Sequence, residues 1–188
     1  MRSALAIVLL LAAWVPAARA SAPDWSGSFG RTLAINSRPD GGGFDARLAA
    51  MWPVEGRFSI GATAIASDMG LTLGRLTDVH SGTDLGELAR QHRAVYGLAW
   101  RLDADVRPVG GWDPFGSATW GFYSVNDELH GNLQGRVAAA GFGLGGGLRR
   151  QVGDRGALGA SLRYTRMFND RLGRYMSAGV DWVWRGAR

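Results

Sequence analysis

Three histidines and the hydroxyl and carboxyl groups near them are the residues best suited to catalysis. The set comprises His80, Ser81, Asp78, Asp84, His92 and His130. A histidine acts as a general base when one ring nitrogen reaches a hydroxyl and a third group holds the ring in place. His80 and Ser81 are neighbours in the chain, which rarely gives that geometry. The histidines also lack the ligand spacing of a zinc site, so we predict no metal and no cofactor.

A glycine-rich stretch at residues 141–146 matches the GxGxxG pattern of dinucleotide sites. Such a site requires a strand before the glycines and a helix directly after them. Residues 138–149 instead alternate throughout, and no helical period follows. We therefore interpret these glycines as small residues that face the narrow interior of a barrel.

The N-terminal segment predicts export. It begins with Met1 and Arg2, continues with an apolar run over residues 4–15 and ends with a small-x-small pattern up to Ala20. These are the three parts of a signal peptide, and we expect cleavage after Ala20 to leave residues 21–188 as a single domain. The apolar run is shorter than the roughly 20 residues that span a bilayer, which disfavours the alternative of a retained membrane helix.

Composition excludes two other classes of protein. The chain has no cysteine, so an exported domain of this kind obtains no stability from disulfides. Its net charge is +5, and every basic residue apart from histidine is an arginine. The arginines are scattered, without a basic run or a basic-aromatic motif, and we predict no nucleic-acid binding.

Alternation with a period of two residues runs through most of the chain and marks strands with two unlike faces. Four stretches show it clearly, at 44–52, 58–67, 93–103 and 175–185. Four others show it more weakly, at about 25–36, 115–126, 138–149 and 158–165. Eight is the even number expected of a single-chain membrane barrel. We predict an all-β fold, an eight-stranded antiparallel up-and-down transmembrane β-barrel.

The chemistry of the two faces indicates which one looks outward. One face is rich in Ala, Leu, Phe and Trp, whereas the other mixes Gly, Ser and Thr with charged residues. The interior of an eight-stranded barrel is only just wide enough to be filled by side chains, so the aromatic face is predicted to lie against lipid. The alternative is a soluble periplasmic lipocalin-like binder, which would bury the aromatic face inside. An interfacial girdle is predicted at Trp52, Trp100, Trp182 and Trp184.

Arg31 is an exception in the first strand. It shares the face of Phe29, Leu33 and Ile35. An arginine on the lipid face costs about 2–4 kcal/mol at the bilayer midplane. We therefore expect either a bulge near Gly30 that turns Arg31 away or a different register in this strand.

Six charged residues are predicted to face the lumen. They are Asp45, Arg47, Arg93, Arg101, Arg163 and Asp181. Each buried charge needs a partner, so we interpret the set as a structural salt-bridge network. Because arginine outnumbers aspartate, a narrow passive pore that prefers anions is an alternative, although eight strands argue against a wide channel.

The connections between strands are predicted to differ in length at the two ends of the barrel. Short turns at 53–56 and 151–156 lie on one side. Longer connections at 36–42, 68–91, 126–131 and 168–173 lie on the other. Membrane barrels have short periplasmic turns and longer external loops. Segment 68–91 is the longest, and we predict it to be an external loop that carries function.

The last predicted strand contains Ser177-x-Gly179-x-x-Trp182-x-Trp184. This pattern resembles the signal by which the outer-membrane barrel assembly machinery recognises its substrates. The pattern of residues 21–188 resembles the small OmpA/OmpX-type and "outer membrane protein β-barrel domain" families. The resemblance implies a Gram-negative outer membrane, lipopolysaccharide and other outer-membrane lipids as surroundings, and the assembly machinery as a partner; we expect a monomer.

The leading hypothesis for function is a non-enzymatic barrel with a structural or interaction role in the cell envelope and with specificity in its outer loops. One alternative is the narrow, porin-like passive pore, and another is the soluble lipocalin-like binder. A third alternative is an enzyme that modifies lipid A at the rim. The lipid A deacylase family carries a His-x-Ser-Asn motif in its seventh strand, and residues 163–170 contain no histidine, so that resemblance fails.

Overall fold

The structure is a computed structural model that describes residues 22–34, 42–54, 57–77, 84–129, 132–169 and 173–186. The expected signal peptide and its cleavage site at Ala20 lie outside the described residues. In the part of the chain that is described, no helix is long and apolar enough to cross a membrane.

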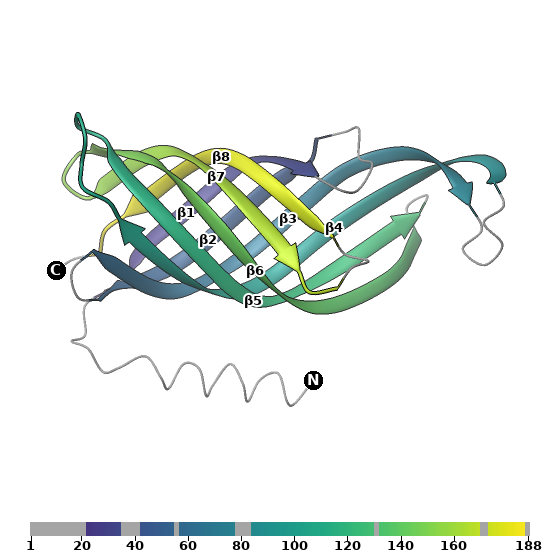
Figure 1. Cartoon of the computed structure of the whole chain (residues 1–188), viewed down its shortest axis with the longest axis horizontal. Coiled ribbons are helices and arrows are strands. Elements are labelled where there is room, and N and C mark those ends of the chain that lie inside the picture. Colours follow the sequence, from purple (N-terminus) through teal and green to yellow (C-terminus); the bar gives the residue numbers. More distant parts are fainter. Residues whose placement is uncertain are drawn as a thin grey trace, which may run out of the picture.

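Eight antiparallel strands form a closed barrel in chain order (Figure 1). They are β1 (Asp24–Ala34), β2 (Phe44–Pro53), β3 (Phe58–Thr77), β4 (Asp84–Asp105), β5 (Asp113–Leu129), β6 (Asn132–Val152), β7 (Gly156–Met167) and β8 (Arg174–Trp184). Each strand pairs with the next, and β8 pairs with β1. Closure lets the wall satisfy its backbone hydrogen bonds internally, as a bilayer requires. The predicted fold and number of strands are confirmed.

The pairing is staggered around the barrel. A row of paired residues that leaves β1 at Asp24 passes Met51 and Gly61, crosses the remaining strands and returns to β1 at Ala34. Such a stagger tilts every strand relative to the barrel axis. We call the end where β3 and β4 project the hairpin end, and the end where the described chain starts and finishes the terminal end (Figure 1).

Strands β3 and β4 are much longer than predicted. Segment 68–91 was predicted to be a loop, and this prediction is wrong, because β3 continues to Thr77 and β4 begins at Asp84. The pairing shifts register between Asp68 and Leu71, where Gly70 has a φ of 79°. This irregularity interrupts the alternation of residue types, so the sequence there resembles a loop. Segment 126–131 is likewise mostly strand, since β5 ends at Leu129 and β6 begins at Asn132.

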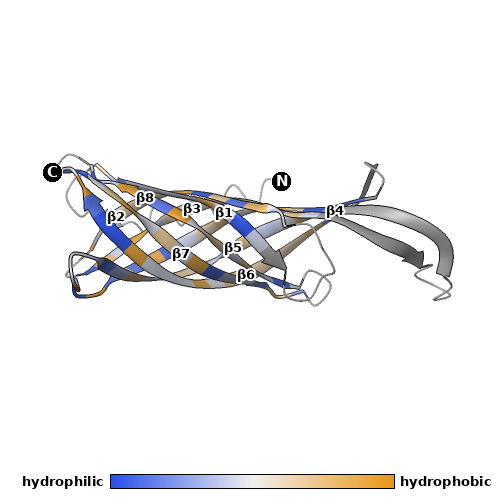
Figure 2. Ribbon diagram, turned by 90° about the horizontal axis from the view of Figure 1, so that it is seen from above, coloured by the Kyte–Doolittle hydropathy of each residue, from blue (hydrophilic) through white to orange (hydrophobic). Residues whose placement is uncertain are grey.

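Exposure alternates along the strands and places the apolar face on the outside of the barrel. Phe29, Leu98 and Trp120 are each more than 60% exposed, whereas Val95 and Tyr123 are buried. Figure 2 shows apolar and polar residues alternating along the strands. An apolar wall of this extent is far larger than the patches of a few hundred Å² that water-soluble monomers expose. The lipocalin-like alternative is therefore wrong about which face lies inside.

Arg31 keeps its place in the lipid-facing register of β1. It pairs with Phe44 on β2 and Ala178 on β8 without a register shift, and its side chain is exposed. The bulge predicted near Gly30 is therefore absent from this described strand. A Cβ added to Gly42 would lie 2.1 Å from Arg31 Nε, so the side chain lies against the backbone just beyond β2 at the hairpin end. Arg31 thus reaches away from the middle of the wall.

The close approach of β2 and β3 at Gly61 gives a first testable prediction. A Cβ on Gly61 would lie 2.0 Å from the carbonyl oxygen of Ala50, which is backbone and has little freedom to move. We expect Gly61→Ala to lower the free energy of unfolding by about 1–3 kcal/mol, as measured by urea titration in phospholipid vesicles. Gly116→Ala in β5 is the matched control, because nothing lies within 4 Å of the added Cβ. An equal loss of stability in both variants would contradict this account of Gly61.

Candidate functional site

Three buried arginine–aspartate pairs occupy the lumen. They are Arg47–Asp45, Arg101–Asp103 and Arg163–Asp181, and no member is more than 6% exposed. Arg47 donates to Asp45 over 2.8 and 3.2 Å, and Arg101 donates to Asp103 over 2.7 and 2.8 Å. Charges buried this deeply are tolerated only when they are paired and hydrogen-bonded. Within each pair the two buried charges therefore balance.

Hydroxyl groups from other strands add hydrogen bonds to each pair, although Asp181 Oδ2 has no hydrogen-bond partner among the described residues. Ser67 on β3 donates to Asp45 over 2.6 Å, and Arg47 donates to Thr165 on β7 over 3.2 Å. Arg101 and Arg163 donate to serines of β1 at 3.3 and 3.0 Å. The network thus connects strands that face one another across the lumen, in addition to the pairing between neighbours.

Five of the six predicted lumen charges lie in this network, and Arg93 does not. Arg93 donates to Asp127 on β5 over 2.6 and 2.9 Å near the hairpin end, where both side chains are partly exposed. Two further members, Asp103 and Arg149, were not among the predicted network residues. The Arg149 guanidinium lies 3.5 Å from both Asp103 Oδ2 and the centre of the Phe115 ring. Arg149 lies two residues after Gly147, on the same face of the strand, and this spacing would have placed it in the lumen.

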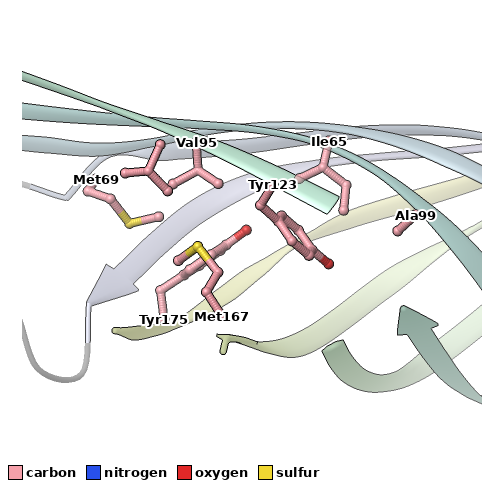
Figure 3. Packing of buried hydrophobic residues seen from close by; sticks show 8 residues of the cluster. Ile65, Met69, Val95, Ala99, Tyr123, Met167 and Tyr175 are labelled. Carbon is pink, nitrogen blue, oxygen red and sulfur yellow. The ribbon is translucent and has the colours of Figure 1, made fainter. Parts of the chain in front are cut away.

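An apolar layer fills the lumen toward the hairpin end (Figure 3). It consists of Ile65, Met69, Val95, Ala99, Tyr123, Val125, Met167 and Tyr175, from strands β3, β4, β5, β7 and β8. None of these residues is more than 6% exposed. The Tyr175 hydroxyl lies 3.1 Å from Ser67 Oγ and so joins this layer to the Asp45 pair. A hydrophobic constriction of this kind excludes water and ions, which argues against the pore hypothesis.

His92 lies between two carboxylates at the hairpin end. Its Nε2 is 2.8 Å from Asp68 Oδ2, and its Nδ1 is 3.5 Å from Glu128 Oε2. The other oxygen of Asp68 accepts a hydrogen bond from the backbone N–H of Gly70 over 2.6 Å. These contacts join β3, β4 and β5 where β3 and β4 leave the barrel. Both ring nitrogens of His92 face carboxylates, so the ring is not placed to activate a hydroxyl.

Most of the other candidate catalytic residues are not tested by the described structure. His80, Ser81, Asp78 and His130 lie outside the described residues, and Asp84 begins β4. Among the side chains that are described, no group of three His, Cys, Asp or Glu residues has the arrangement of a metal site.

The carboxylates around His92 give a prediction about pH. The hydrogen bond with Asp68 and the charges of Asp68 and Glu128 raise the pKa of His92 above its ordinary 6.5, against a smaller opposing effect of burial. His92 is partly exposed and pairs with Leu71 of β3, beyond Ser67, the last residue of β3 that β2 covers. Because folding raises the pKa of His92, the protonated ring stabilises the folded state fully below pH 6.5. This stabilisation is lost as the pH rises through the pKa that His92 has in the folded protein. We expect an NMR titration to give a pKa above 6.5 that Asp68→Asn lowers; a pKa unchanged by Asp68→Asn would contradict this.

Solved structures of other proteins share the architecture, and two of them are compared with this chain. No family model and no curated protein matches the chain. Neisserial surface protein A (NspA) superposes with a TM-score of 0.63 at 13% identity, over 86% of this chain and 96% of that chain. The N-terminal β-barrel domain of Pseudomonas aeruginosa OprF gives 0.51 at 12% identity, over 87% and 97%. The fold is that of small outer-membrane barrels. At such low identity the likeness extends to the fold alone.

The predicted girdle residues occupy two levels of this outer-membrane type of barrel. Trp52 and Trp184 lie at the terminal ends of β2 and β8, and Trp182 lies close to them. Trp100 lies farther along the wall, paired with Trp120. Together with Ile60, Leu102 and Ala118 these two tryptophans line a shallow, lipid-facing hollow of about 180 Å³.

The residues of the predicted assembly signal also have structural roles in the barrel wall. The Trp182 ring covers Gly27, since a Cβ on Gly27 would lie 2.2 Å from Trp182 Cζ2. A Cβ on Gly179 would lie 2.4 Å from the carbonyl oxygen of Phe29. Ser177 is buried on the lumen side of β8. The β1–β8 closure of the barrel therefore requires small residues at Gly27 and Gly179.

Proposed function

We propose that this protein is a non-enzymatic outer-membrane barrel that presents the β3–β4 hairpin outside the cell for contact with macromolecules there. The observation that carries the proposal is the length of these two strands. They remain paired up to Thr77 and Asp84, whereas β2 pairs with β3 only as far as Ser67 and β5 pairs with β4 only as far as Gln91. The projecting part, seen in Figure 1, therefore has backbone edges that no other strand of the described residues covers.

Uncovered strand edges are known recognition sites, because a partner can add a strand to them through main-chain hydrogen bonds. In the proposed orientation the terminal end faces the periplasm, and the projecting β3–β4 hairpin and the longest connection between strands, residues 35–43, lie on the outer side, where membrane barrels have their longer segments. The apolar wall anchors the protein in lipid, and the filled lumen keeps its shape. The barrel inserts through the assembly machinery and works as a monomer in this proposal.

The filled lumen and the two carboxylates on His92 favour an interaction role over the pore and over rim catalysis. An ion would have to pass the apolar layer between Met69 and Tyr175, whose members are all buried. A general base at His92 would have to act through Nδ1, because Nε2 is bonded to Asp68, and Nδ1 already faces Glu128 Oε2 at 3.5 Å.

Cysteine labelling on intact cells tests the proposal. The chain has no cysteine, so single replacements can be read without background. Ser81→Cys lies between the ends of β3 and β4 in the sequence, and Asp154→Cys lies in the exposed turn between β6 and β7. A membrane-impermeant maleimide is expected to label Ser81→Cys in intact cells and Asp154→Cys only after the outer membrane is permeabilised. The reverse pattern, or a protein in the soluble periplasm, would overturn the proposal.

A photo-crosslinking maleimide at the same cysteine tests the interaction itself. On intact cells we expect discrete adducts with another macromolecule at Ser81→Cys. A variant in which residues 71–90 are replaced by a short turn should stay folded, shown by heat-modifiable migration in electrophoresis, because the barrel network lies entirely outside this segment. If Ser81→Cys is labelled on intact cells but forms no adducts, the proposed orientation holds and the proposed contact of the hairpin with a macromolecule is wrong.

A further inference from the structure

We propose that His92 is a pH-sensitive clamp at the base of the projecting β3–β4 hairpin. The protonated ring holds the end of β5, Glu128 and Leu129, against β4, and the neutral ring releases it. Release would add Gln91 and His92 to the edge of β4 that no described strand covers, because these two residues pair with the end of β5. The inference rests on the proposed function, since the clamp regulates the edge that the hairpin presents.

The backbone pairing is irregular on both sides of the clamp. On one side, the pairing of β3 with β4 shifts register between Asp68 and Leu71. On the other side, the pairing of β5 with β6 shifts between Asp127 and Glu128. A register shift of this kind interrupts the ladder and bends the strand locally. The end of β5 therefore has a place to hinge, and side-chain contacts at this level matter for holding it.

Asp68 is the fixed side of the clamp. Its carbonyl oxygen accepts a hydrogen bond over 2.6 Å from Thr32 Oγ1 of β1, and Thr32 is buried. One carboxylate oxygen of Asp68 accepts the N–H of Gly70 over 2.6 Å, and the other lies 2.8 Å from His92 Nε2. The contact between His92 Nδ1 and Glu128 is longer, at 3.5 Å. A change of protonation therefore acts first on the contact with β5.

The number of protons on the ring decides whether Glu128 is attracted or repelled. A protonated histidine has an N–H on both nitrogens, so it donates to Asp68 and attracts Glu128. A neutral ring has a single N–H, which the shorter contact with Asp68 takes. Nδ1 then presents a lone pair to the carboxylate of Glu128. Loss of one proton thus turns attraction between β4 and β5 into repulsion.

A second ion pair limits how far β5 opens. Arg93 donates to both carboxylate oxygens of Asp127, over 2.6 and 2.9 Å, and such bidentate contacts are strong. Opening therefore stops at Asp127. From β3 and β5, the two strands that pair with β4, the charged groups described as acting on His92 are Asp68 and Glu128. Both raise the pKa of His92 above 6.5, which places the change near physiological pH.

Hydrogen exchange followed by mass spectrometry tests the clamp on the full, refolded barrel in phospholipid nanodiscs. Exchange is measured at about pH 5.5 and about pH 8, on either side of the titration of His92, and corrected for the intrinsic rate at each pH. In the original protein, we expect peptides with residues 91–92 and 128–129 to be about fivefold less protected at the higher pH. Protection of residues 157–165, where β7 pairs with β8, should be equal at both.

Three variants locate the effect. His92→Leu removes both contacts of the ring and should give low protection at both pH values. Glu128→Gln donates to the neutral ring and should keep high protection at both. Arg136→Gln is the matched control, because it removes a hydrogen bond between β6 and Asn126 of β5 at the same end. This control should keep the pH dependence of the original protein.

Equal protection at the two pH values in the original protein would overturn the clamp. A pH dependence that survives in His92→Leu, or one that disappears in Arg136→Gln, would also overturn it. Heat-modifiable migration shows whether each variant is folded. If His92→Leu does not fold, Glu128→Gln decides, since a pH dependence that survives in this variant would equally overturn the clamp.

Photo-crosslinking from Ser81→Cys distinguishes this inference from the proposed function. If both are correct, the yield of adducts on intact cells should be about twofold higher at the higher pH, because more of the β4 edge is uncovered. Equal yields despite pH-dependent protection would overturn the regulation. The absence of adducts at either pH would remove the proposed contact together with its regulation, whereas adducts combined with equal protection would remove only the clamp.

Discussion

Replacing Asp45 with alanine is expected to lower the free energy of unfolding by about 3–5 kcal/mol, the usual cost of breaking a buried ion pair. Asp45 is 2% exposed and accepts hydrogen bonds from Arg47 Nε and Ser67 Oγ. Its removal leaves the Arg47 guanidinium charged inside the lumen, with Thr165 as its one remaining hydrogen-bond partner among the described residues. Urea-induced unfolding in phospholipid vesicles, followed by tryptophan fluorescence, measures the loss.

Two further variants separate the ion pair from a general effect of losing a carboxylate. Asp154→Ala removes a carboxylate from an exposed turn and should change the free energy of unfolding by less than about 0.5 kcal/mol. Asp45→Ala/Arg47→Met removes both charges and should recover most of the stability, since apolar replacement of a buried pair is often neutral. A double variant as unstable as Asp45→Ala alone would show that the loss arises from packing and not from the unpaired charge.

Alternation along single strands is enough to place much of this network, including Asp103, which was not among the predicted network residues. Asp45 and Arg47 are two residues apart on one strand, as are Arg101 and Asp103, so each pair shares a face before any register is known. Arg163 and Asp181 are different. They lie on neighbouring strands and are offset, since Arg163 pairs with Ser177 and Asp181 pairs with Gly159. Their contact depends on the register of β7 against β8, which alternation does not determine.

Local irregularities and the stagger of the strands explain why three features of the site were not predicted from the sequence: the His92 contact, the position of Arg93 and the apolar layer. The contact of His92 with Asp68 depends on the register shift after Asp68, which pairs His92 with Leu71. Arg93 has the alternation of a lumen residue, but β4 extends past the barrel there, so the side chain meets Asp127 near the rim. The apolar layer combines residues near the hairpin ends of several strands, and only the stagger brings those ends to one level.

The two layers of the lumen have different physical roles. The charged layer makes directional contacts across the barrel, and its geometry depends on the partners being present together. The apolar layer excludes water from one end of that network, which strengthens the electrostatic interactions within it. Tyr175 belongs to both, because its ring packs with Met167 and Val95 in the apolar cluster while its hydroxyl meets Ser67.

Tyr175→Ala is therefore expected to lower the free energy of unfolding by about 3–5 kcal/mol, the range for removing a large aromatic side chain from a core. Tyr175 is 1% exposed, so the deletion opens a cavity between the two layers. Tyr175→Phe keeps the ring and loses only the hydroxyl, which interacts with Ser67 and Thr165, and this loss should cost about 0.5–1.5 kcal/mol. The same urea titration compares the two variants. If Tyr175→Phe were as unstable as Tyr175→Ala, the hydroxyl bridge to the charged layer would outweigh the packing, and the apolar layer would be secondary to the network.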